Sequence, residues 1–291
     1  MNWYYLKLGL GNTEAESRLG HSRPTAAIFF GKTRVKDLLI GTGSKQGQDF
    51  CKAGLSTNRK KVTMVVAHRG TIWILEPMGE VKEGKMAKYA DGTSYIPKIM
   101  PVKVLKKIDT MEVPAVLAGI SANANLGRGT FREIIHWGDI KAIESVLGRG
   151  IPKEHKNEGP EQLLECLSSV ELETLVAKLF EAQGCFVAAY RGGTTFGVDI
   201  VAHNDAHKVI QLGGITIPPG KRTSVQVKGW RYGMVCPEEV DYLIGLGITK
   251  GPKSFDAEWL LDQVLQFPKV SSWLRRSLNW LPSTYLDLWG I

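Results

Sequence analysis

A helix followed by strands is the clearest pattern in the chain. Its apolar positions recur three and four residues apart: Leu172, Leu175, Val176, Leu179 and Phe180. Ser168 stands three residues before Glu171, which is a capping-box arrangement for a helix start. Gly184 is a natural C-terminal stop. The spacing therefore predicts an amphipathic helix that begins after Ser168 and ends before Gly184.

Alternating and fully apolar runs after this helix predict strands. Cys185–Tyr190 and Val198–His203 read as an antiparallel pair joined across Arg191-Gly192-Gly193, and Val225–Lys228 reads as a further strand. Pro237–Leu246 is predicted as a helix. The long interval between Asp199 and Gln226 contains paired glycine and proline turns and predicts an extra hairpin.

The first part of the chain is predicted to be mainly β. Short β-like runs alternate with glycine and charged turns, and they are Trp3–Leu8, Thr25–Phe30, Val62–Ala67, Thr71–Glu76 and Met100–Leu105. Ser44–Leu55 and Val113–Leu117 are predicted as short helices. This spacing favours a small barrel or a strongly curved sheet.

Composition and charge divide the chain into two domains. Residues 148–161 combine glycine, proline and charge without apolar periodicity, so they are the predicted linker between domain 1–147 and domain 162–291. Residues 1–150 hold 23 Lys and Arg against 13 Asp and Glu, whereas residues 151–291 hold 14 against 16. The basic surplus of the first half suits a nucleic-acid-binding module. The alternative is an ordinary solvated surface.

The C-terminal tail from Asp256 to Ile291 is rich in tryptophan. It holds four of the eight tryptophans and two predicted amphipathic helices, around Trp259–Phe267 and Ser272–Leu281. These helices serve either as part of the core or as a dimer contact.

Polar residues in the predicted strands form a candidate metal site. Gln226 and Lys228 are two residues apart, so they point to one face of their strand. Asp199 lies inside an apolar run, where an unpaired carboxylate is costly unless a cation or donor meets it. Glu173 lies beside the apolar stripe of the preceding helix. Carboxylate and amide oxygens suit a hard cation such as Mg²⁺, although each residue alone would be read as structural or surface-exposed.

The ordered set of motifs resembles the catalytic domain of Mrr-type restriction endonucleases, in the PD-(D/E)XK nuclease superfamily. The resemblance is carried by ELETLVAKLFEAQGCFVAAYRGGTTFGVDIVAH and SVQVKGW, over roughly residues 160 to 245. It implies an α/β domain with an αβββαβ core, in which a mixed sheet is flanked by helices. It implies that Glu173, Asp199, Gln226 and Lys228 are catalytic, with the first three binding Mg²⁺, or Mn²⁺ in its place.

The N-terminal segment loosely resembles the PUA-like or EVE-like barrels that precede some such nucleases. The resemblance rests on MNWYYLKLG, MGEVKEG and MPVKVLKKI. A barrel of this kind would take a flipped modified base into an aromatic cage. The candidate cage residues are Trp3, Tyr5, Trp73 and Tyr95. The candidate nucleic-acid-binding residues are Arg59, Lys60, Lys61, Arg69, Trp230 and Arg231. Each of these aromatics, taken alone, also fits a place in the core.

The sequence thus predicts a magnesium-dependent DNA endonuclease for modification-dependent restriction or antiviral defence. It is expected to act on DNA, modified or unmodified, as a homodimer. A cytoplasmic location is expected because the chain shows no leader and no apolar run long enough for a membrane span. One alternative is a nuclease effector that a defence-system partner or a signal activates. Another is a nucleic-acid-binding protein that has lost catalysis. The widely spaced cysteines favour neither zinc nor disulfides, and GTGSKQGQ at 41–48 lacks phosphate-loop spacing.

Overall fold

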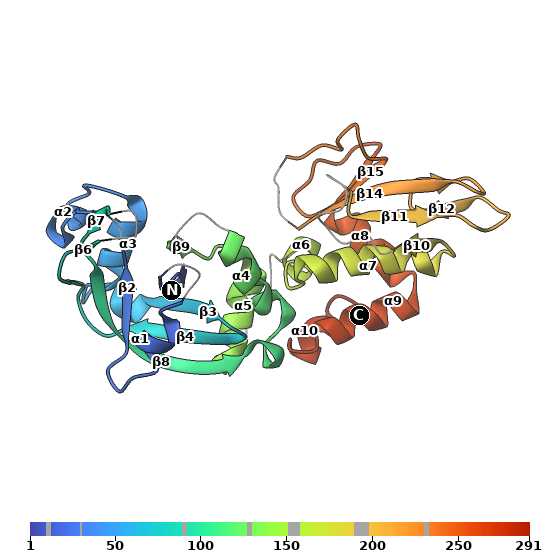
Figure 1. Ribbon diagram of the computed structural model, residues 1–291. Coiled ribbons are helices and arrows are strands. Elements are labelled where there is room, and N and C mark those ends of the chain that lie inside the picture. Colours follow the sequence, from blue (N-terminus) through green and yellow to red (C-terminus); the bar gives the residue numbers. More distant parts are fainter. Residues whose placement is uncertain are drawn as a thin grey trace. The chain divides into compact units, whose positions relative to one another are not determined.

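The chain folds into two compact units, which are described separately. The computed structural model describes residues 1–9, 13–29, 31–88, 92–126, 130–150, 158–188, 198–229 and 233–291, with the backbone alone for 121–126. Unit 1 consists of Met1–Val113 and Leu117–Leu147, and unit 2 of Pro114–Val116 and Gly148–Ile291. Figure 1 labels elements of both units where there is room.

Unit 1 is mainly β, as its sequence predicts. Its strands are β1 (Asn2–Leu6), β2 (Thr25–Ile28), β3 (Val62–His68), β4 (Thr71–Pro77), β5 (Lys82–Glu83), β6 (Ala87–Lys88), β7 (Ser94–Tyr95), β8 (Lys98–Asp109) and β9 (Phe131–Glu133). Its helices are α1 (Ala15–Leu19), α2 (Val35–Leu39), α3 (Lys45–Ala53), α4 (Ala115–Leu126) and α5 (Trp137–Val146), with 3-10 turns at Arg59–Lys61 and Thr110–Glu112.

A curled, mixed sheet forms the body of unit 1. Its strand order is β2-β8-β4-β3-β1-β9, with β5 also paired to β8, and only β1 and β3 run parallel. The long strand β8 pairs first with β2 and β5 and then with β4, and an irregularity in the β4 pairing lies between Ile74 and Leu75. Such a bulge increases the local bend and twist. Among the described strands this path stays open between β2 and β9, so unit 1 is a half-barrel rather than a closed one.

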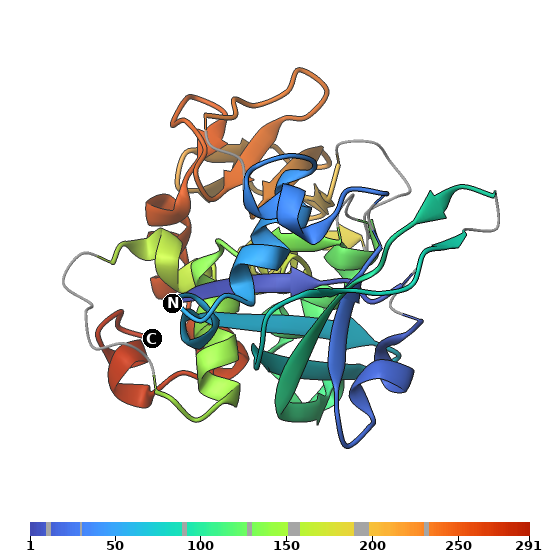
Figure 2. The ribbon, with the colours of Figure 1, turned by 90° about the vertical axis from the view of Figure 1, so that its left-hand side faces the viewer.

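Helix α3 covers the apolar face of this sheet. Phe50 is fully buried, and its ring meets that of Phe131 edge-on, with centroids 5.3 Å apart. Trp73 and Met64 lie in the same cluster. The β6–β7 pair extends from the rest of the unit in Figure 2.

Unit 2 combines a sheet with five helices among its described residues, and it also includes the first two residues of α4. The helices are α6 (Pro160–Leu164), α7 (Ser169–Ala182), α8 (Ala257–Leu265), α9 (Pro268–Ser277) and α10 (Ser283–Asp287). The strands are β10 (Phe186–Ala188), β11 (Ile200–His203), β12 (Ile210–Leu212), β13 (Ile215–Ile217), β14 (Arg222–Lys228), β15 (Tyr242–Gly245) and β16 (Ser254–Phe255).

Helix α7 is the predicted amphipathic helix. Ser168 Oγ accepts from the Glu171 N–H at 3.2 Å, and Glu171 Oε2 accepts from the Ser168 N–H at 2.9 Å, so the capping box forms. The helix ends at Ala182. Gln183 is its C-cap residue, and Gly184 follows with φ of 94°. Figure 1 shows α7 between the sheet and α9.

The sheet of unit 2 has the order β10-β11-β14-β15-β16. Strands β10, β11 and β14 are antiparallel, and β14, β15 and β16 are parallel. The predicted hairpin forms as β12 and β13, and all four of its isoleucines and leucines at alternating positions are buried. The strands and helices confirm the predicted mixed α/β fold.

The predicted helix over Pro237–Leu246 is wrong. A turn and strand β15 occupy that interval. Asp241 Oδ2 accepts from the Ser224 N–H at 2.8 Å, and its backbone N–H donates to Ser224 O at 3.1 Å. These bonds fold the segment directly onto β14, and no helix lies in the described residues of this parallel connection, 229 and 233–241.

The tryptophan-rich tail covers the core of unit 2. Trp259, Trp273, Trp280 and Trp289 are partly buried and pack against the same apolar cluster as α7 and the sheet. Trp259 also donates its Nε1–H to Gly213 O at 2.7 Å, which ties α8 to the hairpin turn. This packing accounts for the apolar character of the tail within one chain.

Candidate active site

The centre of the candidate site is Asp199, which immediately precedes β11. Its backbone N–H donates to Val225 O at 3.0 Å, and its Oδ2 accepts from the Val227 N–H at 2.7 Å. The regular pairing of β11 with β14 ends at Ile200 and Val225. Beyond that pair, the Val227 N–H donates to the side-chain carboxylate of Asp199 instead of to a backbone carbonyl of β11. This hydrogen bond holds the carboxylate between the two strands.

Lys228 and Glu173 lie beside this carboxylate. Lys228, the last residue of β14, places Nζ 3.8 Å from Asp199 Oδ2, with side chains 27% and 14% exposed. Burial raises the pKa of Glu173, and the negative charge of Asp199 raises it further, whereas Lys228 lowers it. The structure therefore brings together residues from α7, the start of β11 and the end of β14. Two carboxylates and one ammonium leave a net negative charge.

Gln226 completes the set on the same strand face as Lys228. It is 6% exposed, and its Oε1 is buried without a hydrogen-bond partner among the described residues. A buried acceptor left unsatisfied costs about 1–3 kcal/mol, so such an atom usually has a functional reason. A bound cation would satisfy it.

The donor set fits a hard divalent cation. No group of three or more His, Cys, Asp or Glu side chains in the described part of the chain could hold a metal ion. The candidate site instead offers two carboxylates and the unsatisfied amide oxygen of Gln226. Oxygen ligands with a net negative charge are what Mg²⁺ and similar ions prefer.

Sequence reasoning missed Gly245, which lies closely against the backbone of Lys228. The two residues face each other in the parallel pairing of β14 with β15. A Cβ on Gly245 would lie 2.1 Å from Lys228 O and 2.9 Å from Lys228 N. The only signal in the sequence is a glycine at the end of an apolar run.

Gly245→Ala is expected to displace Lys228 and to lower the rate of the DNA cleavage that the sequence predicts at least tenfold. Because the clash is with backbone, the strands must shift, and overpacking of this kind costs about 1–3 kcal/mol of stability. Denaturant unfolding and cleavage assays measure the two effects. Gly251→Ala is the matched control, because its Cβ would meet only Ser254 Cβ at 3.9 Å. A Gly245→Ala protein with wild-type stability and cleavage would contradict the assignment.

The candidate nucleic-acid-binding residues do not form one cluster. Arg59, Lys60 and Lys61 form the 3-10 turn that leads into β3, whereas Arg69 lies at the turn after its other end, with φ of 46°. A seven-residue strand spans about 23 Å, so two separate sites result. Trp230 and Arg231 lie outside the described residues.

The four candidate cage aromatics do not converge either. Trp3 and Tyr5 share one face of β1, and the register through β3 places Trp73 on the opposite face, with Tyr4. Trp73 is 1% exposed in the core, and Trp3 donates its Nε1–H to Glu144 of α5 at 3.2 Å. Tyr95 lies in the separate β6–β7 pair.

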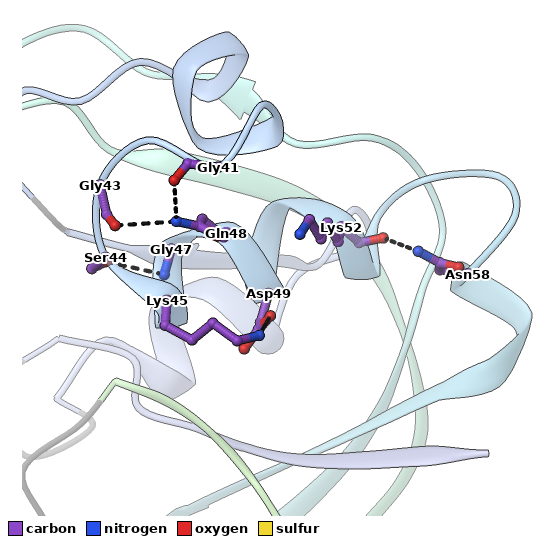
Figure 3. A network of polar contacts seen from close by, with 9 residues as sticks. All are labelled: Gly41, Gly43, Ser44, Lys45, Gly47, Gln48, Asp49, Lys52 and Asn58. Carbon is purple, nitrogen blue, oxygen red and sulfur yellow. Dashed lines mark hydrogen bonds and ion pairs between the residues drawn. The ribbon is translucent and has the colours of Figure 1, made fainter.

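The glycine-rich loop at 41–48 is a helix cap. Figure 3 shows Gln48 turned back to the loop, where its Nε2 donates to Gly41 O at 2.8 Å and to Gly43 O at 3.1 Å. Ser44 Oγ accepts from the Gly47 N–H at 3.2 Å. These bonds use the polar groups of the loop to begin α3.

Comparison with known proteins identifies the second unit. The family model Mrr_cat, described as a restriction endonuclease, matches residues 164–254, which run from α6 into β16 and include all four candidate catalytic residues. No curated protein and no solved structure matches the chain significantly. The resemblance of unit 1 to PUA-like or EVE-like barrels therefore stays a prediction. None of the described helices is long and apolar enough to cross a membrane.

Proposed function

Because residues 164–254 form a restriction endonuclease domain of Mrr type, we propose that the chain is a magnesium-dependent DNA endonuclease with its active site around Asp199. The observation that supports this site most strongly is the convergence of Asp199, Lys228 and Glu173 beside the unsatisfied Oε1 of Gln226. The DNA substrate follows from the domain, and the residue roles below are proposals.

Each side chain has a distinct role in phosphodiester hydrolysis. Asp199, Glu173 and Gln226 would hold Mg²⁺, or Mn²⁺ in its place, and the ion would polarise the phosphate and activate water. Asp199 is already held by the Val227 N–H, so it needs little reorganisation. Lys228 would orient the attacking water and offset the charge that develops on the phosphate. The water oxygen forms the new bond to phosphorus, and the bond to the 3′ oxygen breaks, which leaves a 3′-hydroxyl.

We propose modification-dependent restriction or antiviral defence as the biological role. The support is the basic surplus of residues 1–150, together with the loose resemblance of that part to barrels that read modified bases. The alternatives are a nuclease that a partner protein or signal activates and a nucleic-acid-binding protein without catalysis.

Plasmid digestion tests catalysis and the reader role together. Methylated and unmethylated plasmids are incubated with the full chain in Mg²⁺, in Mn²⁺ and with EDTA. We expect cleavage of the methylated plasmid that EDTA abolishes. Equal cleavage of both plasmids would contradict the reader role but would leave the nuclease proposal standing. If the folded protein cleaved neither plasmid, either alone or with a cell lysate added to supply an activating partner, the nuclease proposal would be contradicted.

A dimer on DNA is expected, because one such site cuts one strand and a double-strand break needs two. The rate of double-strand cleavage should rise faster than linearly with protein concentration, and sedimentation with DNA should show two chains. The tail packs on the core of its own chain, so this expectation does not assign the dimer contact to the tail. A monomer both free and on DNA, with double-strand cleavage first order in protein, would contradict this expectation.

A further inference from the structure

A groove of about 960 Å³ lies in unit 2 between the second half of α7 and the start of α9. Its volume is in the range of small-molecule sites. Six of its lining residues carry the chemistry: Lys178, Glu181, Phe267, Lys269, Trp273 and Arg276. Four of these lie on or beside α9, beyond residue 254, where the match to the nuclease family ends.

The charged side chains that line this α7–α9 groove have a net positive charge. Lys178, Lys269 and Arg276 line it against the single carboxylate of Glu181, and none of the four makes an ion pair with another residue in the described part of the chain. Lys269 and Arg276 are exposed. Such a lining complements an anion with more than one charge, for which guanidinium and ammonium groups are the usual protein donors.

An aromatic surface accompanies these cations. Trp273 is partly buried against the core, and Lys178 Nζ lies 5.8 Å from the centroid of its ring. Phe267 stands at the entry to α9 on the same groove. A ligand with a planar ring can stack on such side chains while its charged groups meet the cations.

The groove opens on the opposite flank of α7 from the candidate active site. Glu173 and Lys178 are five residues apart, which places them about 140° apart around the solvent side of the helix, and the buried stripe of Leu175, Val176 and Leu179 occupies the rest of its circumference. Figure 1 shows α9 on the side of α7 away from the sheet. DNA held at Asp199 therefore faces a different surface, and the groove is suited to a separate ligand.

We propose that the α7–α9 groove binds a free nucleotide. Its phosphates lie against Lys178, Lys269 and Arg276, and its base lies against Trp273. This site does not depend on the proposed catalysis, because its residues are outside the candidate active site.

Calorimetric titration of the full chain tests the site. The probes are ATP, tripolyphosphate and adenosine, in EDTA, so that no divalent cation draws phosphate to the active site. We expect ATP to bind with a Kd below about 1 mM. Tripolyphosphate and adenosine should each bind at least tenfold more weakly, because only ATP offers both phosphates and a ring.

Paired charge reversals locate the binding. Lys269→Glu with Arg276→Glu should weaken ATP binding at least tenfold, whereas Lys208→Glu with Lys221→Glu, at exposed lysines elsewhere in unit 2, should not. Trp273→Leu should remove the preference for ATP over tripolyphosphate. If it unfolds the protein, as circular dichroism would show, the charge reversals still decide.

Three outcomes would overturn the proposal. They are no ATP binding at 1 mM, unchanged binding after the Lys269 and Arg276 reversals, and displacement of ATP by a single-stranded oligonucleotide at lower concentration through the same residues. The last result would assign the groove to nucleic acid. None of them bears on cleavage at Asp199, which the plasmid assay measures separately.

Discussion

Asp199→Asn is expected to lower the DNA cleavage rate about 100-fold or more while the protein stays folded. Asparagine keeps an oxygen that can accept the Val227 N–H, so the bond that positions the residue survives. It loses the negative charge that a metal ion requires. Cleavage of plasmid DNA in Mg²⁺ measures the rate, and denaturant unfolding measures the stability.

The choice of asparagine over alanine separates catalysis from folding. Alanine would leave the Val227 N–H without its partner, and an unsatisfied donor costs about 1–3 kcal/mol of stability. Asp262→Asn is the matched control, because the side chain of Asp262 is exposed on α8 and makes no hydrogen bond or ion pair with another described residue. Wild-type cleavage by Asp199→Asn would remove Asp199 from the active site.

Lys228→Met should give a similar loss. Methionine keeps much of the apolar stem of a side chain that is 27% exposed, but it cannot offset phosphate charge. Its effect on stability should be small. If Lys228→Met retained full activity while Asp199→Asn did not, metal binding would stand and the role proposed for Lys228 would not.

Local signals made much of unit 2 predictable. The capping box of Ser168 and Glu171 and the apolar spacing of α7 depend on residues within one helix, and they fix its start and its buried face. The alternation that places Gln226 and Lys228 on one side follows from strand geometry alone. An apolar run around Asp199 indicated that its carboxylate had to meet a donor or a cation.

Contacts between distant segments were not predictable in the same way. The bond from the Val227 N–H to Asp199 depends on where the pairing of β11 and β14 ends, and the need for glycine at 245 depends on how closely β15 approaches Lys228. The segment before Gly245 was predicted as a helix because its proline and glutamates resemble a helix start. Its bonds to Ser224 prevail over that local preference.

The register of a sheet decides which aromatics can act together. Trp3, Tyr5 and Trp73 look equivalent in sequence, as aromatics within short strands. A shift of one residue in the strand register moves a side chain to the other face of the sheet. The observed register places Trp73 on the opposite face from Trp3 and Tyr5. Parity across strands from different parts of the chain cannot be counted without knowing how they pair.

DNA binding by the full chain should fall steeply with salt, about 1000-fold or more between 50 and 200 mM, if unit 1 grips the backbone at six or more phosphates. The physical reason is the charge difference, 23 cations against 13 anions in residues 1–150 and 14 against 16 in residues 151–291. Fluorescence anisotropy on the Asp199→Asn protein in EDTA measures binding without cleavage.

Charge reversals in unit 1 should lower the slope of log affinity against log salt. Lys60 and Lys61 are exposed at the turn before β3, so Lys60→Glu with Lys61→Glu should remove two phosphate contacts and reduce the slope by about 2. Lys208→Glu with Lys221→Glu, in unit 2, adds the same negative charge and should change the slope much less. If both pairs reduced the slope equally, net charge alone would govern binding. If only the unit 2 pair did so, the nuclease unit would hold the DNA by itself and the basic surplus of the first unit would serve another purpose.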